Sequence, residues 1–330
     1  MKNDPALEAF AHQNLPPGSR ITRLKGDAST RRFFRVVPPH APSIILMLFP
    51  EAFDWNDSAL RSNHEHLELI GVPVPRILGV FPEQGIVLQE DLGDTTLQAA
   101  ILADPGYDRA SRYREAIDLI VLLQDRGTHE LPSSAAARKS ALDEAKLLAE
   151  LEHFYKHFVL GYRGAHPSAE ETAQLASFFA HLAYSLDGAE RVLCHRDFQS
   201  RNLMITPDGL RVIDYQDARM GPATYDLASL LRDSSLDVEA ELREEGIRYF
   251  LSRRPALWEE VFREEFERTA LQRNIKDLGT FGYQAHHLGN QDYERYIPRT
   301  LTMVRDALLR GRKYHGIFEV FEKHVFKGGA

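Results

Sequence analysis

The sequence predicts an α+β fold with two lobes: a small antiparallel-sheet lobe with one helix, and a larger, mostly helical lobe. Short β-branched or aromatic runs, separated by Gly and Pro turns, fill about the first ninety of the 330 residues. From Asp94 onward, apolar residues recur mainly at helical spacing. Residues 89–93 link these two parts. We therefore expect a first lobe over residues 1–91 and a second lobe over residues 92–330.

Five strands and one helix are expected in the first lobe. The helix begins near Asp57 and Ser58, which are favourable N-cap residues, and ends where Gly71 and Pro73 interrupt it. The strands are expected at residues 20–24, 33–37, 44–49, 77–81 and 86–88. In the second lobe, amphipathic helices are expected at residues 113–124, 141–157, 172–186, 238–251 and 258–288.

A polar loop at residues 195–202 carries the most informative side chains. It lies between two short apolar runs, and a further β-like run at residues 210–213 follows after a turn, so we expect a hairpin to hold the loop rigidly. Asp197, Asn202 and Asp214 occur at the spacing that phosphoryl transfer from ATP requires. The loop is therefore a candidate catalytic site.

The chemistry of these residue types assigns them roles. Asp197 would accept the proton of an attacking hydroxyl, while the Asn202 amide oxygen and the Asp214 carboxylate would hold the magnesium ions that bridge the nucleotide phosphates. Taken singly, each residue could instead belong to a polar turn capped by an Asx side chain. The complete set, with apolar strands on both sides, favours catalysis. Cys194, inside an apolar run, is expected to be a packed structural residue.

This segment resembles the catalytic loop of the aminoglycoside phosphotransferase and choline kinase family, whose members are small-molecule relatives of the protein kinases. Tyr215 and Gln216 follow the magnesium aspartate where protein kinases have Phe-Gly, which fits the small-molecule branch. The resemblance implies a protein-kinase-like fold with ATP and Mg²⁺ as cofactors. It also implies that His195 and Asp226 support the catalytic loop, with Asp226 on a helix expected to begin near Pro222.

The same resemblance implies nucleotide contacts in the first lobe and in the link. A flexible loop between the first two strands could offer backbone N–H groups and a hydroxyl to the phosphates. In relatives, the link hydrogen-bonds the adenine through backbone groups, which maps to the Gln89 carbonyl and the Asp91 amide; an ordinary interdomain turn is the alternative. The nucleotide-binding residues expected on these grounds are Asp27, Ala28, Ser29, Arg31, Gln89 and Asp91.

The third strand lacks the lysine that protein kinases use to bind phosphates and to pair with a helix glutamate. Met47 stands at the corresponding place, and Glu65 fits the helix glutamate only loosely. Two explanations remain open. Either the chain is a degenerate kinase that acts as an ATP-binding regulatory module, or it is an active enzyme that neutralises phosphate charge with Arg31, Arg32 or Arg35. The intact base and both magnesium ligands favour an active enzyme.

Several blocks of the chain are similar to bacterial anomeric kinases for N-acetylmuramate and N-acetylglucosamine, namely residues 26–29, 74–78, 90–94, 194–197, 201–204 and 230–233. This similarity implies a sugar kinase of cell-wall recycling that phosphorylates the anomeric hydroxyl. A kinase for another small alcohol or an aminoglycoside is the alternative. Aminoglycoside-modifying members usually have Gly after the catalytic histidine, where this chain has Arg196. Acceptor contacts, with structural salt bridges as the alternative, are expected from Arg196, Arg201, Arg232 and Asp233.

The composition argues against several other classes of protein. The net charge is −8, with acids and bases mixed along most helices, so we expect neither a nucleic-acid groove nor binding to an anionic membrane. A single cysteine cannot form an internal disulfide and suggests a reducing compartment. No signal peptide or membrane-spanning run is recognised. We expect a soluble, cytoplasmic enzyme that binds a sugar and a nucleotide without an obligate protein partner.

Overall fold

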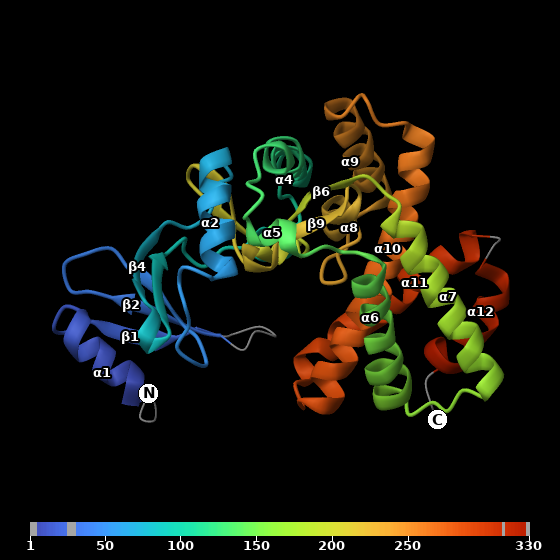
Figure 1. The fold of residues 1–330 in the computed structure, drawn as a ribbon, viewed down its shortest axis with the longest axis horizontal. Helices are drawn as coiled ribbons and strands as arrows, with labels where there is room; N and C mark the ends of the chain where they lie inside the picture. Colours follow the sequence, from blue (N-terminus) through green and yellow to red (C-terminus); the bar gives the residue numbers. More distant parts are fainter. Residues whose placement is uncertain (1–4, 25–30, 312–313, 328–330) are drawn as a thin grey trace.

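The computed structural model describes residues 5–24, 31–311 and 314–327, and it has the two-lobed α+β architecture that the sequence predicts. Figure 1 shows the small lobe, coloured blue to cyan, beside a mostly helical large lobe. The small lobe contains a five-stranded antiparallel sheet in the order β1-β2-β3-β5-β4. Its strands, which confirm the five predicted ones to within two residues, are β1 (Arg20–Arg23), β2 (Arg32–Val37), β3 (Ile44–Leu48), β4 (Ile77–Phe81) and β5 (Ile86–Glu90).

The sheet has two different faces, because side chains alternate along each strand. Leu48 points to one face, where Phe10 of α1 (Pro5–Asn14) belongs to the same buried apolar cluster. Met47 lies on the other face, in a cluster that includes α2 (Ala59–Ile70) and continues into the large lobe. α2 is the helix predicted for this lobe, whereas α1 was not predicted. The alternation therefore turns Met47 toward the space between the lobes.

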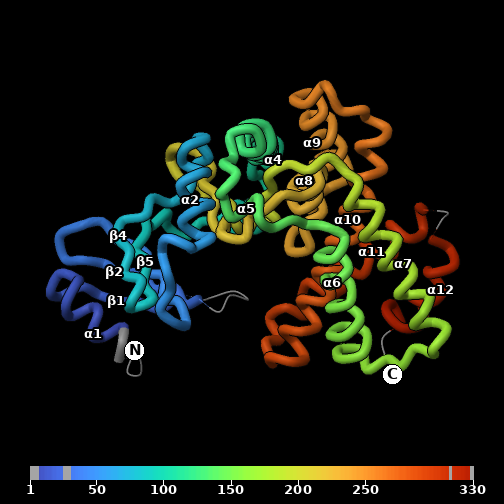
Figure 2. Tube along the Cα trace, in the orientation of Figure 1, coloured from blue at the N-terminus to red at the C-terminus, as the bar shows by residue number. Residues whose placement is uncertain are grey.

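Helices fill most of the large lobe. α10 runs beside α6 and also packs against α8 and α11, so it forms the centre of the lobe (Figures 1 and 2). The five predicted helices correspond to α4, α6, α7, α9 and α10. Within the described residues, no helix is long and apolar enough to cross a membrane. The helices are α3 (Leu97–Ala103), α4 (Arg109–Leu122), α5 (Ala136–Lys139), α6 (Glu144–Phe154), α7 (Ala169–Asp187), α8 (Tyr225–Leu231), α9 (Ala240–Arg253), α10 (Glu259–Gly282), α11 (Ile297–Arg310) and α12 (His315–Phe321).

Two of the predicted helices are longer than the regular α-helical segments. α6 continues as the π-helical segment Tyr155–Tyr162, and α10 continues as the π-helical segment Tyr283–His287. A π-helical turn closes wider hydrogen-bonded rings but keeps the chain helical. The apolar pattern therefore extends past the α-helical ends, which explains the long predictions over residues 141–157 and 258–288.

The strands around the catalytic loop pair differently from the single hairpin expected. β7 and β8 form a hairpin, as predicted, but β6, which leads into the loop, pairs with β9 instead. The loop is therefore fixed between two separate ribbons. Pro222 ends β9, and α8 begins only at Tyr225, so the predicted helix start at Pro222 is wrong; a strand end tolerates proline because no ladder N–H is needed there. The strands are β6 (Arg191–Cys194), β7 (Leu203–Thr206), β8 (Gly209–Val212) and β9 (Arg219–Pro222).

Candidate active site

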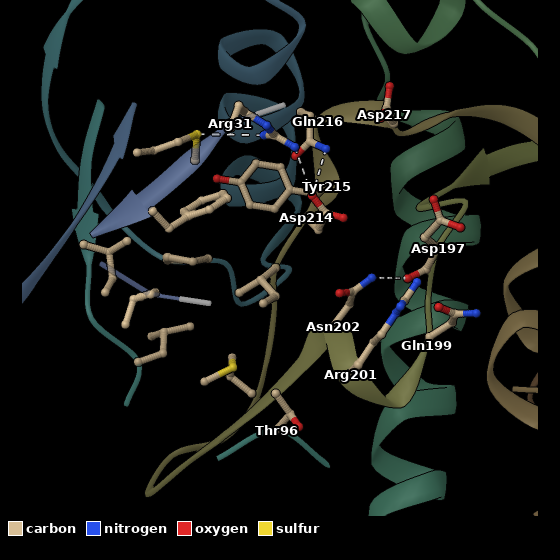
Figure 3. A pocket seen from close by; sticks show the side chains of 18 of the residues that line it. Arg31, Thr96, Asp197, Gln199, Arg201, Asn202, Asp214, Tyr215, Gln216 and Asp217 are labelled. Atoms are coloured by element: carbon tan, nitrogen blue, oxygen red, sulfur yellow. Dashed lines mark hydrogen bonds and ion pairs between the residues drawn. The ribbon is translucent and has the colours of Figure 1, made fainter. Parts of the chain in front are cut away.

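A cavity of about 1060 Å³ lies between the two lobes and brings the predicted catalytic side chains together. Asp197, Asn202 and Asp214 all line it, as do Gln89 and Asp91 of the link. Figure 3 shows the loop residues and Asp214 around the same space. These groups come from separate segments of the chain, so the fold supplies the convergence that the proposed chemistry requires.

Asp226 of α8 holds the start of the catalytic loop. Its Oδ2 accepts a hydrogen bond from the His195 N–H at 2.7 Å, and its Oδ1 accepts one from the Arg196 N–H at 2.9 Å. The His195 ring donates from Nε2 to the Ile213 carbonyl at 2.9 Å, which ties the loop to the residue before Asp214. Burial raises the pKa of Asp226, and the hydrogen bonds from His195 and Arg196 oppose this rise. We expected Asp226 and His195 to support the catalytic loop, and these hydrogen bonds are the contacts that such a role needs.

Arg196 and Asp214 are the only non-glycine residues in the described part of the chain with a positive φ, at 82° and 66°. Such conformations cost about 1–3 kcal/mol and persist where surrounding contacts enforce them, often at functional sites. A glycine would adopt this φ at position 196 without strain. Here the arginine is anchored instead, because its Nη2 donates to the buried Glu150 at 3.0 Å. The site thus contains backbone strain within the catalytic loop, at Arg196, and after it, at Asp214.

Asp226→Asn is expected to lower the free energy of unfolding by about 2 kcal/mol, because an amide can accept only one of the two backbone hydrogen bonds. The remaining loop N–H would face the amide NH₂ group in a buried place. Urea unfolding followed by circular dichroism measures the change. Asp208→Asn, on an exposed residue of the β7–β8 turn, is the control and should stay within about 0.5 kcal/mol of wild type. An unchanged urea midpoint for Asp226→Asn would contradict the brace.

Three cations surround the Asp197 carboxylate. Lys276 Nζ lies 3.1 Å from its Oδ1, and Arg273 Nη2 lies 3.9 Å from the same atom. Burial alone would raise the pKa of Asp197, but the charges of Lys276, Arg196 and Arg273 outweigh burial and hold the pKa well below its usual value. The carboxylate is therefore ionised throughout the neutral pH range. It is a weak base, which suits a loose phosphoryl-transfer transition state that asks for positioning more than proton abstraction.

Asn202 and Asp214 present oxygen atoms that fit a divalent cation. The Asn202 amide nitrogen donates to the Asp197 carbonyl at 2.8 Å, which leaves the amide oxygen for a cation. The Asp214 Oδ1 accepts hydrogen bonds from Arg31 at 3.1 Å and from Gln216 at 2.9 Å, so it already attracts positive charge. The described residues contain no group of three or more His, Cys, Asp or Glu placed to hold a metal ion. A cation here would take one carboxylate and one amide oxygen, and its other ligands from phosphates and water.

Arg31 lies next to Met47, the residue at the place of the missing lysine. Its Nη1 is 3.8 Å from the Met47 Sδ, and its Nη2 reaches the aspartate opposite, as the dashed lines in Figure 3 mark. Arg35 also lines the cavity, but it is committed to the link, since its Nε and Nη2 donate to the two Asp91 carboxylate oxygens at 2.6 and 2.9 Å. Arg32 is not among the residues that line the cavity. Of the three arginines considered, Arg31 is therefore the one that faces the phosphate side.

Glu65 does not take the place of the helix glutamate of protein kinases. Its side chain is 59% exposed and pairs with Arg61 of the same helix at 2.7 Å. α2 instead contacts the segment that follows Asp214, because the His64 Nδ1 lies 2.9 Å from the Tyr215 hydroxyl in a buried pair. α2 is thus coupled to the metal-side segment by a hydrogen bond rather than by an ion pair to β3.

The residues of the link, 89–93, all line the cavity. The Asp91 carboxylate is buried and accepts hydrogen bonds from Arg35 and, at 3.0 Å, from the Gly93 N–H. Burial alone would raise the pKa of Asp91, but these hydrogen bonds together lower it. This carboxylate therefore shapes the link, and both Gln89 and Asp91 are among the residues that line the cavity. Three other expected nucleotide contacts lie outside the described residues, namely Asp27, Ala28 and Ser29.

The four residues expected to contact the acceptor separate into two pairs. Arg196 and Arg201 line the cavity, whereas Arg232 and Asp233 do not. The Asp233 Oδ2 accepts from the Ser200 N–H at 3.1 Å and from its hydroxyl at 2.6 Å, so Asp233 is buried behind the catalytic loop. Arg232 faces a separate cavity and pairs with an α10 glutamate at 2.9 Å. Their side chains are held by Ser200 and by the α10 glutamate, so the acceptor contacts expected from Arg232 and Asp233 find no support in the cavity lining. The next two residues, Ser234 and Ser235, do line the cavity.

Sequence reasoning missed several polar residues that line the cavity, among them Gln199, Lys276 and Asp277. Gln199 is 3% exposed, and its Oε1 has no hydrogen-bond partner within the described part of the chain. Asp277 accepts a hydrogen bond from the Ser234 hydroxyl at 2.7 Å. A signal existed in α10, where polar residues between 269 and 277 are buried on more than one side of the helix. An ordinary amphipathic helix buries a single apolar stripe.

Most of the chain is similar in sequence to a known protein family and to named kinases. The profile of the phosphotransferase enzyme family matches residues 20–261. An N-acetylmuramate/N-acetylglucosamine kinase of Neisseria meningitidis serogroup B is 31% identical over 296 residues, covering 86% of this chain and 84% of that protein. A kinase of the same name from Pseudomonas aeruginosa is 28% identical, covering 90% of this chain and 86% of that protein.

Solved structures share the fold at low sequence identity. An amicoumacin kinase in complex with AMP-PNP, Ca²⁺ and Ami matches with a TM-score of 0.66 at 14% identity, covering 93% of this chain and 94% of that chain. A choline kinase from Cryptosporidium parvum Iowa II matches with a TM-score of 0.61 at 15% identity, covering 91% of this chain and 96% of that chain. Both likenesses extend across the two lobes.

Proposed function

The chain belongs to the phosphotransferase enzyme family, and from this premise we propose that it transfers the γ-phosphoryl group of ATP to the anomeric hydroxyl of N-acetylmuramate or N-acetylglucosamine. The names of relatives that match most of the chain support this acceptor. The observation that carries the proposal is the convergence of Asp197, Asn202 and Asp214 on one interlobe cavity. Phosphoryl transfer requires a base and cation ligands around one space.

In the proposed reaction, Asp197 orients the anomeric hydroxyl and takes its proton as the oxygen bonds to the γ-phosphorus. The bond from this phosphorus to the oxygen shared with the β-phosphate breaks, and ADP leaves. Asn202 and Asp214 would hold Mg²⁺, which supplies positive charge against the phosphate oxygens when bound. Asp226 fixes the loop that carries Asp197. Most of the rate enhancement then comes from positioning and electrostatics.

We further propose that residues 1–91 form the nucleotide lobe and residues 92–330 the lobe of catalysis and acceptor binding. Supporting this division, Arg35 of β2 fixes Asp91 at the point where the chain leaves the sheet. The Gln89 carbonyl and the Asp91 amide would hydrogen-bond the adenine. Apolar side chains that line the same cavity would contact its faces, among them Leu24, Ile45, Met204 and Ile213.

The names of the relatives support a sugar over an aminoglycoside, because both are N-acetylmuramate/N-acetylglucosamine kinases. The cavity itself is lined by charges of both signs, among them Arg201, Lys276 and Asp277. Asp277 contacts Ser234 at 2.7 Å and Lys276 at 3.6 Å. An ATP-binding regulatory module, in turn, would need no ionised base beside a cation site. ATP as the donor is consistent with a cytoplasmic enzyme.

A substrate comparison by phosphorus NMR tests the proposal directly. The protein, ATP and Mg²⁺ are incubated separately with N-acetylmuramate, N-acetylglucosamine, choline and kanamycin. We expect a new phosphate signal coupled to the anomeric proton of one or both sugars. Phosphorylation of choline or kanamycin alone would replace the sugar assignment, and nucleotide binding without turnover on any acceptor would favour the regulatory module.

Arg31→Met is expected to raise the KM for ATP about tenfold, because Arg31 would provide the phosphate contact that a strand lysine provides in protein kinases, and a hydrogen bond to a charged group contributes about 1.5–3 kcal/mol. Steady-state kinetics at saturating sugar measures the change. Adding Met47→Lys to Arg31→Met should recover part of the loss, since the Met47 Sδ lies 3.8 Å from the Arg31 guanidinium.

Arg32→Met is the matched control for this pair of variants. Arg32 is the neighbouring residue and does not line the cavity, so the KM of Arg32→Met for ATP should stay close to the wild-type value. An unchanged KM in Arg31→Met would remove Arg31 from the phosphate site.

A further inference from the structure

Among the described residues, Lys276 is the cation that both hydrogen-bonds the Asp197 carboxylate and lines the cavity. Its Nζ lies 3.1 Å from the Asp197 Oδ1 and 3.6 Å from the Asp277 Oδ1, and its side chain is 14% exposed. Arg273 is held mainly by other groups, because its Nη1 donates to the Arg196 carbonyl at 2.7 Å and its guanidinium stacks on Tyr225 at 4.8 Å. Its Nη2 has no hydrogen-bond partner among the described residues and lies 3.9 Å from the Asp197 Oδ1. Arg273 does not line the cavity, whereas Lys276 does.

Arg196, the remaining cation, is anchored away from the transfer point. Its Nη2 pairs with the buried Glu150 at 3.0 Å, and its Nη1 lies 4.0 Å from Asp217. Within the described part of the chain, Lys276 has no comparable anchor beyond the carboxylates of two residues that line the cavity, Asp197 and Asp277. A lysine ammonium on a flexible stem can rotate between such partners without loss of charge.

We propose that Lys276 is a catalytic residue that contacts the phosphoryl group during its transfer and neutralises charge on its oxygens. The proposal rests on the function proposed above, with Asp197 as the base. The hydroxyl oxygen must lie about 2.6–3.2 Å from an Asp197 oxygen to pass on its proton. A cation bonded to the same carboxylate therefore lies beside the phosphorus that this oxygen attacks.

ATP and the acceptor are the only reactants that the transfer step needs. The acceptor oxygen forms a bond to the γ-phosphorus, its proton passes to the Asp197 carboxylate, and the bond to the bridging oxygen breaks with its electron pair on ADP. Lys276 exchanges a hydrogen bond with Asp197 for one with a phosphoryl oxygen and takes no part in the proton transfer. Preorganised charge of this kind acts mainly in the transition state, so its loss should lower kcat more than it raises either KM.

The test compares Lys276→Met and Lys276→Arg with wild type on both N-acetylglucosamine and N-acetylmuramate. Lys276→Met is expected to lower kcat about 10²-fold on both sugars, the scale seen when a single electrostatic stabiliser is removed. Calorimetry should show the dissociation constant of Mg·AMP-PNP within about threefold of wild type. Lys276→Arg keeps the charge and should recover about tenfold of the lost kcat. Lys323→Met, which removes a lysine paired with Glu171 at 2.7 Å outside the cavity, is the control.

Three results would overturn the assignment, and each is distinct from a failure of the proposed function. The first is a Lys276→Met kcat within about threefold of wild type on both sugars. The second is a raised KM confined to N-acetylmuramate, which would make Lys276 a ligand of the acceptor carboxylate. The third is an equal loss of kcat in Lys276→Met and Lys276→Arg together with a lowered unfolding midpoint in both variants. That result would make the role of Lys276 structural. Failure of the proposed function would appear instead as an inactive wild type or an active Asp197→Asn.

Discussion

Asp197→Asn is expected to lower kcat about 10³-fold, because an amide cannot accept the hydroxyl proton and general-base groups contribute about 10²–10⁴-fold. The affinity for Mg·ATP should stay equal or become tighter, since the substitution removes a negative charge from beside Lys276, Arg196 and Arg273. Steady-state kinetics on the phosphorylated sugar and calorimetry with Mg·AMP-PNP measure the two effects separately. A wild-type kcat in this variant would remove Asp197 as the base.

The pH dependence of the wild-type enzyme provides a second check on Asp197. An unperturbed aspartate has a pKa of about 3.9. The folded-state pKa lies well below this value, so the carboxylate stays ionised as the pH falls from 8 to about 5. We therefore expect no acidic limb in kcat over this range. The stabilisation from the ionised form is present above the unfolded-state pKa and is lost only in stronger acid. Asp118→Asn, on a surface residue paired with Arg253 at 3.3 Å, is the control for both measurements.

The fold was predictable where local patterns and tertiary structure agree. The five strands of the small lobe and α2 follow from β-branched runs, turn residues and helix stops, all of which act over a few residues. The pairing of β6 with β9 was not predictable in the same way, because strands separated by a long loop choose partners through contacts that a local pattern does not contain. The start of α8 was predicted wrongly for a related reason, since Pro222 suits a strand end as well as a helix start.

The site was predictable to the extent that its residues are close in sequence. Asp197, Asn202 and Asp214 share one loop and one hairpin, and the structure places all three around one cavity. Lys276 lies 79 residues after Asp197 along the chain, and its approach depends on how α10 crosses the large lobe. Arg31 and Arg35 are distinguished only by their side-chain contacts, because Arg35 donates to Asp91 whereas Arg31 donates to Asp214. Three-dimensional packing therefore decides which of several similar cations meets the substrate.

Asp214→Asn is expected to abolish most metal-dependent nucleotide binding and to lower kcat about 10²-fold or more, because the cation site would lose its carboxylate and retain only neutral amide oxygens. Asparagine is the informative replacement at this position. Asp214 has a φ of 66°, a left-handed conformation that Asn tolerates and Ala does not, so the variant changes the charge without adding backbone strain. A loss of function in Asp214→Ala could instead come from the backbone.

Measuring the nucleotide affinity with and without Mg²⁺ isolates the contribution of the cation to binding. In wild type the affinity for ATP should rise strongly with Mg²⁺, whereas in Asp214→Asn this rise should fall at least about tenfold. Metal-free binding should stay intact, because Arg31 still lines the cavity in this variant. Asp217→Asn changes the same charge three residues further along, on a 54% exposed side chain that pairs with Arg219, and should preserve the Mg²⁺ effect. Equal behaviour of the two variants would mean that the general charge of this segment, and not coordination by Asp214, controls nucleotide binding.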